Sequence, residues 1–351
     1  MAVARTRKRV AVVGSTAEYE ETCHLGEGGF GAVVKARHRL TGETVAIKRL
    51  TAPGVRRREL LWEACNLQDC SGIPFVVGLH GLVRDLATAD VCLAMECVGP
   101  SLHAVLRDHL SRGGPPLSES TVRTVMWQLL TGAKKMHERH IIHRDIKTEN
   151  ILVGDDHTVV KICDLGLAMP IYERPPYKAA GTLWYMAPEM LLGMPDYDAL
   201  VDSWSLGCVM AELITGRPLF QRCHELGQLL AIFNVLGVPD DKTWPWFSST
   251  AFAAQVLPEV DVRQKHNCLR HQFPEAKLSK EGFDVLNGLL TCNPDKRLTA
   301  AAALKLPWFA KVDALSLPRK EEPAAALPKK KDLLIGHPAP PKKRKQCVIF
   351  F

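Results

Sequence analysis

Thirteen residues near the middle of the chain, IIHRDIKTENILV (141–153), combine side chains that could act on a phosphate group. Asp145 supplies a carboxylate, Lys147 an ammonium and Asn150 an amide, and a second carboxylate, Asp164, follows fourteen residues after Asn150. Phosphoryl transfer needs metal ions, positioned donors and an acceptor for the hydroxyl proton, and little covalent help from the protein. Amide and carboxylate oxygens are ligands that suit Mg²⁺. The set therefore predicts a phosphoryl-transfer site, because a merely polar loop does not explain all four residues.

Two stretches nearer the N-terminus could hold the phosphates. LGEGGFGAVV (25–34) carries Gly26, Gly28 and Gly31, which would let backbone N–H groups approach a nucleotide without interference from a Cβ. Alone, this motif is also compatible with a flexible hairpin, and the strand expected after it argues against a Rossmann fold. VAIK (45–48) places Lys48 at the end of an apolar strand, where it needs an anionic partner.

The elements that must position these residues change character along the chain. Residues 19–98 read as short alternating strands such as 32–38, 43–50 and 91–97, interrupted by one helix over about 55–69. From 99 onward the pattern is helical, with a helix over 118–139 that begins at a Ser cap and further amphipathic segments near 201–215, 225–236 and 279–291. The pattern predicts an α+β protein with a small β-rich lobe and a larger helical lobe.

Composition and charge limit the function classes. The 351 residues are 46% hydrophobic, the eleven cysteines show no CxxC pair, and VAVVG (10–14) is too short to span a membrane or act as a signal peptide. We expect reduced intracellular thiols and no membrane association. The net charge of +7 lies in residues 1–10 (+4) and 311–351 (+6), which leaves about −3 on the body of the chain. This distribution argues against nucleic-acid binding by the folded core.

Together with GTLWYMAPE (181–189), these motifs resemble those of eukaryotic Ser/Thr protein kinases over about residues 19–310. The resemblance implies the bilobal protein-kinase fold, ATP and Mg²⁺ as cofactors, and a protein hydroxyl as phosphate acceptor. Lys48 would hold the α- and β-phosphates and pair with Glu63, with Glu59 as the competing register. Asp145 would be the catalytic base, and Lys147 would lie near the γ-phosphate. Asn150 and Asp164 would bind Mg²⁺.

The same resemblance implies the nucleotide contacts. Leu25, Val33, Ala46 and Leu152 would enclose adenine, and Met95 would be the gatekeeper residue at its back. The expected ATP-binding set is Leu25, Gly26, Glu27, Gly28, Gly29, Phe30, Gly31, Ala32, Val33, Ala46, Lys48, Met95, the backbone of Glu96 and Val98, and Leu152. Leu165 replaces the Phe that usually follows the metal-binding Asp. Because Leu keeps an apolar contact there, we expect activity to survive, and a pseudokinase or scaffold is the alternative.

Residues 204–246 and 273–309 resemble the cyclin-dependent kinase group, although MAP kinases share parts of both stretches. The regulatory elements of that group differ here. APGVRRRELLWEA (52–64) stands in place of the cyclin-docking helix, so the sequence leaves cyclin binding open. Gly29 and Phe30 stand where the group carries inhibitory Thr and Tyr sites.

The activation segment departs further from the group. In PPYKAAGTLWYMAPE (175–189) the position of the activating phosphothreonine holds Tyr177, and of the three arginines that would read its phosphate only Arg144 remains. Trp62 and Met169 replace the other two. We expect that Tyr177 is no substitute for the switch, that packing holds the loop, and that Arg144 is little used.

Further contacts follow from the same resemblance. Thr182 is expected to bond Asp145 and Lys147, Glu189 to pair with Arg297, and Asp202 to anchor the catalytic-loop backbone. Gly181 and Met186 stand where proline-directed kinases carry Val and Arg, which predicts weak preference for Pro after the target residue. His137, His140 and His143 fit the run into the catalytic loop better than a zinc site.

The expected domain boundaries are a basic segment over 1–18, the β-rich lobe over 19–98, the helical lobe over 99–310 and a disordered basic tail over 311–351. KKRK (342–345) after Pro340 and Pro341 reads either as a nuclear import signal or as a solvated basic stretch. We therefore expect an intracellular protein of the nucleus, the cytoplasm or both.

Overall fold

The structure is a computed structural model that describes residues 10–28, 31–49, 57–173, 175–256, 266–315 and 317–318. The predictions for Gly29 and Phe30, for residues 1–9, and for the KKRK stretch therefore lie outside the described residues. The chain divides into two compact units, Met1–Arg319 and Lys320–Phe351, and every described residue belongs to the first.

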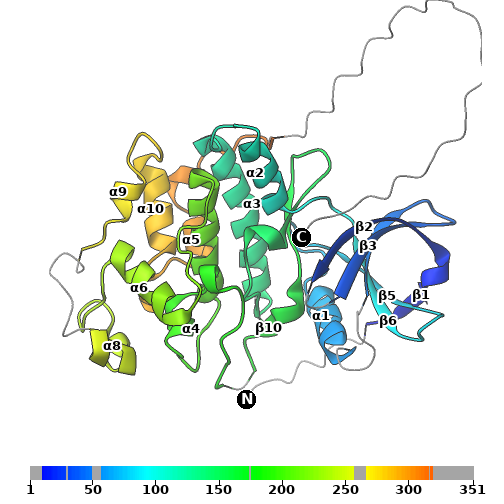
Figure 1. Ribbon diagram of the computed structural model, residues 1–351, viewed down its shortest axis with the longest axis horizontal. Helices are drawn as coiled ribbons and strands as arrows, with labels where there is room; N and C mark the ends of the chain where they lie inside the picture. The colour runs from blue at the N-terminus through cyan, green and yellow to red at the C-terminus, as the bar shows by residue number, and fades with distance from the viewer. Residues whose placement is uncertain are drawn as a thin grey trace, which may run out of the picture. The chain divides into compact units, whose positions relative to one another are not determined.

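A six-stranded sheet forms the first part of this unit, in the order β1-β5-β6-β4-β3-β2 (Figure 1). The strands are β1 (Val12–Ser15), β2 (Tyr19–Gly28), β3 (Gly31–His38), β4 (Thr44–Arg49), β5 (Leu79–Arg84) and β6 (Val91–Glu96). Side chains alternate between the two faces, as the pleat requires. On β4, Val45 and Ile47 pack into an apolar cluster on one face, which leaves Ala46 and Lys48 on the other.

The first strand lies outside the predicted boundary at residue 19. β1 pairs in parallel with β5, with Val12 opposite Leu82 and Ser15 opposite Arg84. The apolar run that the sequence analysis set aside as too short for a membrane is therefore an edge strand. Its backbone N–H and C=O groups gain partners along β5, which is the main reason for an exposed, short run to order here.

Helix α1 (Arg57–Asp69) packs against the sheet through Leu60 and Ala64, which meet Leu82, Val91 and Leu93. The predicted helix over 55–69 is confirmed except for residues 55–56, which are not described. The second part of the unit is helical, as predicted. Its helices are α2 (Leu102–Ser111), α3 (Glu119–Glu138), α4 (Pro188–Leu191), α5 (Leu200–Thr215), α6 (Glu225–Leu236), α7 (Pro245–Ser248), α8 (Ala251–Val256), α9 (Leu269–Gln272), α10 (Lys280–Leu289) and α11 (Ala300–Ala303).

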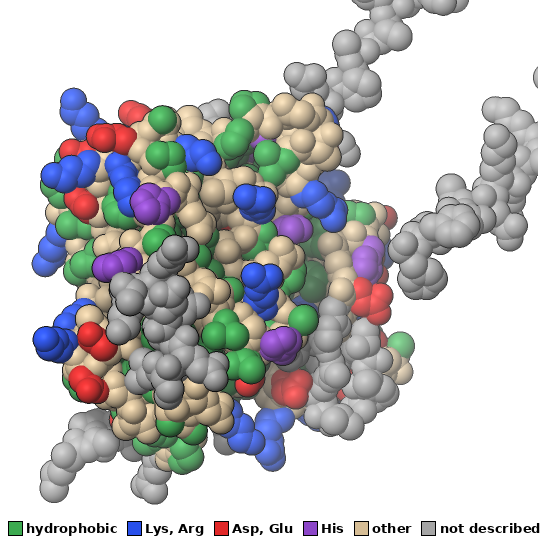
Figure 2. Space-filling view, turned by 60° about the vertical axis from the view of Figure 1, so that its left-hand side comes forward, with side chains coloured by type: hydrophobic (Ala, Val, Ile, Leu, Met, Phe, Trp, Pro, Cys, Tyr) green, Lys and Arg blue, Asp and Glu red, His purple; other side chains and the backbone are tan. Residues whose placement is uncertain are grey.

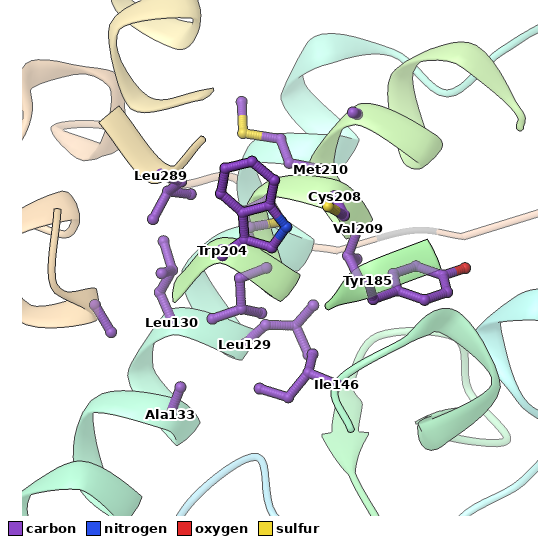
Figure 3. Close-up of a cluster of buried hydrophobic side chains, with 14 of the residues drawn as sticks. Leu129, Leu130, Ala133, Ile146, Tyr185, Trp204, Cys208, Val209, Met210 and Leu289 are labelled. Atoms are coloured by element: carbon purple, nitrogen blue, oxygen red, sulfur yellow. The ribbon is translucent and has the colours of Figure 1, made fainter. Parts of the chain in front are cut away.

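The helical core centres on α3 and α5. Ser118 caps α3 by accepting a hydrogen bond from the Thr121 N–H, as the Ser before the helix predicted. Figure 3 shows the indole of Trp204 from α5 among Leu129 and Leu130 of α3 and Leu289 of α10. All of these side chains are fully buried, and this rigid core supports the loops that follow α3.

Four short strands carry the loops of the site. β7 (Ile141–Ile142) pairs with β10 (Met169–Pro170), and β8 (Ile151–Val153) pairs with β9 (Val160–Ile162). Consequently, the segment 143–150 and the segment 163–168 start and end on the same small ladders. Residues far apart in sequence are thereby fixed side by side.

The packed chain extends beyond the predicted boundary at residue 310. Leu315 and Leu317 are buried, and the Thr124 hydroxyl on α3 donates to the Asp313 carbonyl. The Leu317 N–H also donates to the carbonyl of His157 in the β8–β9 turn. The expectation of disorder from residue 311 is therefore wrong for the described residues of 311–318, because two leucines there fill apolar space beside α3.

Two further observations concern the described helices and the surface of the folded unit. Within the described part of the chain, no helix is long and apolar enough to cross a bilayer. On the face shown in Figure 2, Lys and Arg side chains lie dispersed among Asp and Glu side chains.

Candidate active site

The ammonium group of Lys48 on β4 contacts carboxylates from two other parts of the chain. Lys48 Nζ lies 2.9 Å and 2.8 Å from the two carboxylate oxygens of Glu63 and 3.0 Å from Asp164 Oδ1. Glu63 is buried on α1, whereas Glu59 is exposed. The structure therefore selects Glu63 over the competing register.

Burial and charge act in opposite directions on this cluster. Burial alone would lower the pKa of Lys48, but the carboxylates of Glu63 and Asp164 raise it above its ordinary value, so Lys48 stays charged. For Asp164, burial raises the pKa and Lys48 lowers it, with a net lowering that keeps the carboxylate ionised. A buried cation is thus compensated by two carboxylates from distant parts of the chain.

The backbone at Asp164 is strained. Its φ of 61° and ψ of 73° lie in the left-handed region, which costs a non-glycine residue about 1–3 kcal/mol. The next residue, Leu165, begins the 3₁₀ turn η3 (Leu165–Leu167), and its side chain is fully buried. Leu at this position therefore keeps the apolar anchor that the sequence analysis expected.

The catalytic-loop residues form one hydrogen-bonded network. Asp145 Oδ1 accepts hydrogen bonds from the backbone N–H and the hydroxyl of Thr182, both at 2.8 Å. Lys147 Nζ lies 2.7 Å from the Thr182 hydroxyl and 3.1 Å from Asp145 Oδ2. Asn150 Nδ2 donates to the backbone carbonyl of Asp145 at 2.9 Å and to its Oδ2 at 3.0 Å. The predicted contacts of Thr182 are confirmed.

A buried carboxylate beneath the loop fixes its backbone. Asp202 of α5 accepts hydrogen bonds from the N–H groups of His143 and Arg144, both at 2.8 Å, and from the His137 ring at 2.9 Å. Burial raises the pKa of Asp202, but these donors, the His137 ring first, lower it overall. The predicted contact of Asp202 with the catalytic-loop backbone is confirmed. The same carboxylate is also the hydrogen-bond partner of the His137 ring. The His143 ring bonds the Cys163 carbonyl.

The expected nucleotide contacts gather on one face of the sheet. Val33 lies opposite Lys48, and Ala46 lies opposite Met95, so these four side chains share a face. Gly26 pairs with Val33, Glu27 with Ala32 and Gly28 with Gly31 across the glycine-rich hairpin. Leu25 is 47% exposed on β2. Val98 is buried two residues after the end of β6, and Leu152 of β8 pairs with Ser101 in an isolated β-bridge.

The residues expected to hold Mg²⁺ fit that ion. Both N–H groups of the Asn150 amide point at Asp145, which leaves the amide oxygen as the free end of the group. Asp164 is ionised, and its side chain keeps 29% exposure beside a Lys48 side chain with only 9%. Two protein oxygens plus phosphate and water oxygens are a usual Mg²⁺ environment. Among the described residues, no group of three or more His, Cys, Asp or Glu side chains could hold a metal ion.

Residues 19–309 match the protein kinase domain family. The chain belongs to this family. The kinase is also 45% identical over 303 residues to "Putative cyclin-dependent kinase F-2" of Oryza sativa subsp. japonica, a match that covers 84% of the kinase and 90% of that relative. Cyclin-dependent kinase G1 of Arabidopsis thaliana is 38% identical over 340 residues, or 92% of the kinase and 52% of that relative. The kinase thus spans about half the length of this G-type relative.

These similarities place the kinase in the cyclin-dependent branch of the family. It is an ATP-dependent Ser/Thr protein kinase with protein substrates, and the predicted bilobal fold is confirmed. Its glutamate of the APE motif, Glu189, forms a bidentate pair with Arg297 at 2.5 and 2.7 Å, as predicted. Both side chains are buried, and they tie the end of the activation segment to the last helices.

The activation segment of the kinase packs around a second tyrosine that the sequence analysis did not single out. Tyr177 lies edge-on to Tyr197 with ring centroids 5.4 Å apart, and its hydroxyl donates to the Glu173 carbonyl at 2.7 Å. The Tyr197 hydroxyl donates to the Lys178 carbonyl at 2.7 Å and accepts from Arg144 Nη1 at 3.1 Å.

The expectation that Arg144 is little used is wrong. Its Nε donates to the Leu167 carbonyl at 2.7 Å in addition to the bond to Tyr197. A backbone carbonyl and a phenol therefore take the place of a phosphate as its partners. The signal for this arrangement was weak, because nothing in the sequence around Tyr197 marks it as a partner of residue 144.

Proposed function

We propose that the kinase moves the γ-phosphoryl group of ATP to Ser or Thr hydroxyls with Asp145 as the proton acceptor and with Asn150 and Asp164 as Mg²⁺ ligands. Bound Mg²⁺ would neutralise phosphate charge at that site. Lys48, fixed by Glu63, would bind the α- and β-phosphates. The observation that carries the proposal is the position of Lys48 Nζ, within 3.0 Å of carboxylates from both α1 and the segment after β9.

The network around Asp145 defines how a proton reaches it. Thr182 takes both lone-pair directions of Oδ1, while Oδ2 faces Asn150 and the Lys147 ammonium. With ATP bound, the negative γ-phosphate would attract the Lys147 ammonium away from Oδ2. A lone pair on Oδ2 would then be available to the substrate hydroxyl, while Asn150 would keep the carboxylate oriented.

The test is transfer of labelled phosphate from ATP by the purified chain, with and without an added cyclin. Asp145→Asn should lower kcat by about 10²–10⁴-fold, because the amide cannot accept the proton. Asp155→Asn, an exposed control in the β8–β9 turn, should leave kcat unchanged. Transfer that survives in Asp145→Asn would refute the assigned base, and a wild type that transfers nothing under any condition would favour a pseudokinase or scaffold.

The proposal includes an activation segment that works without phosphate. Tyr177 and Tyr197 pack against each other, Arg144 already has two neutral partners, and the side chain of Met169 is buried. A phosphate on Tyr177 would find one engaged cation and an apolar neighbour. Tyr177→Phe should therefore keep transfer within about twofold of wild type, since a single exposed hydrogen bond contributes little. Loss of activity in Tyr177→Phe, together with phosphotyrosine at that site in wild type, would mean that the switch survives in another chemical form.

Weak selection for Pro after the target residue is the third part of the proposal. Gly181 has a φ of 109°, and a Cβ there would lie 2.2 Å from the Arg144 carbonyl oxygen. This backbone position therefore excludes the Val of proline-directed kinases unless the loop shifts. A peptide-library profile should show little enrichment of Pro at the position after Ser or Thr. Strong Ser-Pro or Thr-Pro enrichment would contradict this part.

The proposal also covers an activating subunit and the location of the kinase in the cell. A cyclin is the activating subunit to test, because cyclin dependence is in the printed names of the relatives. KKRK (342–345) acts as a nuclear import signal. A fluorescent fusion should lose nuclear enrichment when Lys343 and Arg344 are changed to Ala, and unchanged distribution would contradict the assignment.

A further inference from the structure

Two neutral side chains of α1 bind the segment that follows Asp164. The amide of Asn66 donates to the Leu165 carbonyl at 3.1 Å and to the Ala168 carbonyl at 2.9 Å. The indole Nε1 of Trp62 donates to the same Ala168 carbonyl at 2.8 Å. One helix thus holds both ends of the η3 turn.

The placement of these residues follows from helical spacing. Trp62 and Asn66 are four residues apart, so they project from the same side of α1, and Glu63 lies between them in sequence, three residues before Asn66. Asn66 is fully buried, which is unusual for an amide on a helix face unless its hydrogen bonds are made. Both of its N–H groups have a carbonyl partner.

The segment is held on its other side as well. Arg144 Nε donates to the Leu167 carbonyl, and Met169 pairs with Ile142 of β7. Carbonyls 165, 167 and 168 are therefore all bound by side chains, immediately after the strained Asp164. The donors on α1 carry no charge and need no phosphate.

We propose that Trp62 and Asn66 are positioning residues that hold Glu63, and through it Lys48, in register with Asp164, in place of a phosphate-dependent contact between α1 and the activation segment. The inference rests on the proposed catalytic roles of Lys48 and Asp164. It accounts for an active arrangement in a chain whose phosphate-reading arginine positions hold Trp62 and Met169. If Trp62 and Asn66 only stabilised the fold, substituting them would cause the same loss with Glu63 present and with Glu63 changed to Gln.

Trp62→Phe is the principal variant, because it keeps an aromatic ring and removes only the N–H donor and one ring. Trp246→Phe is the matched control. It makes the same change at a partly buried tryptophan of α7, away from the site. Asn66→Leu removes both amide donors at similar volume. All are made in the full chain, and each is also combined with Glu63→Gln.

Trp62→Phe should lower kcat for peptide phosphorylation by about tenfold, the scale of one partly buried hydrogen bond, with KM for the peptide unchanged. In the Glu63→Gln background it should cause little further loss, since both changes disable the same contact. Trp246→Phe should match wild type. An unchanged kcat in Trp62→Phe, or a full additional loss in the Glu63→Gln background, would overturn the proposal.

Amide hydrogen exchange gives a readout that needs no catalysis. In an Asp145→Asn chain, Trp62→Phe and Asn66→Leu should speed exchange in residues 163–169 and in α1, while α3 and α5 keep wild-type protection. Equal exchange in all variants would contradict the proposal that Trp62 and Asn66 hold the segment after Asp164, even if the chain transferred no phosphate. If Asn66→Leu lost amide protection in every element, including α3 and α5, Asn66 would be required for folding. The Trp62→Phe variant would then decide the proposal.

Discussion

At the scale of single residues, burial decides which charged pairs matter. Glu189 and Arg297 lie 108 residues apart in sequence and are almost completely buried. Asp108 of α2 and Arg112, the residue that directly follows this helix, form a pair four residues apart with both side chains substantially exposed. Water screens the exposed pair but not the buried one, so removing one partner should lower the free energy of unfolding far more for the buried pair.

Arg297→Met should lower the free energy of unfolding by about 3–5 kcal/mol, because it leaves the Glu189 carboxylate buried without its cation. Adding Glu189→Gln should recover part of that loss. Denaturant titration measures both effects, with Arg112→Met as a control expected to change stability by about 0–1 kcal/mol. Equal losses in Arg297→Met and Arg112→Met would show that burial does not control this pair.

At the scale of elements, α5 supports both the catalytic loop and the activation segment. It provides Asp202 under the loop and, ten residues later, Glu212. The carboxylate of Glu212 is buried and accepts hydrogen bonds from the Tyr185 hydroxyl at 2.7 Å and the Thr148 hydroxyl at 3.1 Å. Burial raises the pKa of Glu212, so its ionised form opposes folding.

This raised pKa predicts a pH-dependent difference between the wild type and Glu212→Gln. Above about pH 4.3 the unfolded state releases the Glu212 proton while the folded state retains it, so the wild type loses stability as pH rises until the folded group also ionises. The Tm advantage of Glu212→Gln should therefore grow from pH 5 upward and then level off. An advantage that shrinks with rising pH would contradict the assignment.

At the scale of the whole molecule, the folded unit includes chain beyond the last helix. Leu315 and Leu317 are 4% and 3% exposed, and Asp313 and Leu317 bond α3 and the β8–β9 turn through backbone groups. The compact unit closes at Arg319. Its boundary was missed because Pro, Ala and Lys dominate the composition after Phe309, and two leucines do not alter that average.

Truncation should separate the packed segment from the rest. A chain ending at residue 319 should keep the wild-type Tm, whereas one ending at residue 310 should melt lower. Leu317→Ala in the full chain should cost about 2–5 kcal/mol, and Leu40→Ala, 91% exposed, should cost almost nothing. Equal Tm values for the two truncations would mean that residues 311–318 do not stabilise the unit.

Much of the site could be predicted from sequence because its chemistry is local. Asp145, Lys147 and Asn150 lie within six residues, and their types alone indicate phosphoryl transfer. The choice of Glu63 over Glu59 required either the family pattern or the structure, because the two glutamates lie four residues apart on one helix and sequence spacing alone does not separate them. Asn66 gave one usable signal, a lone amide on the buried face of α1.

The sequence by itself determined the fold class, the order of strands and helices along the chain, and the set of groups that handle phosphate. These features can be predicted from residue types and from their spacing over short stretches of the chain. The tertiary structure decided which distant groups meet: Asn66 with Ala168, Arg144 with Tyr197, and Leu317 with the β8–β9 turn. The physical reason is that these contacts span 50 to 160 residues and depend on how the packed elements lie. The pattern of residue types over a short stretch does not indicate which distant residues will come into contact.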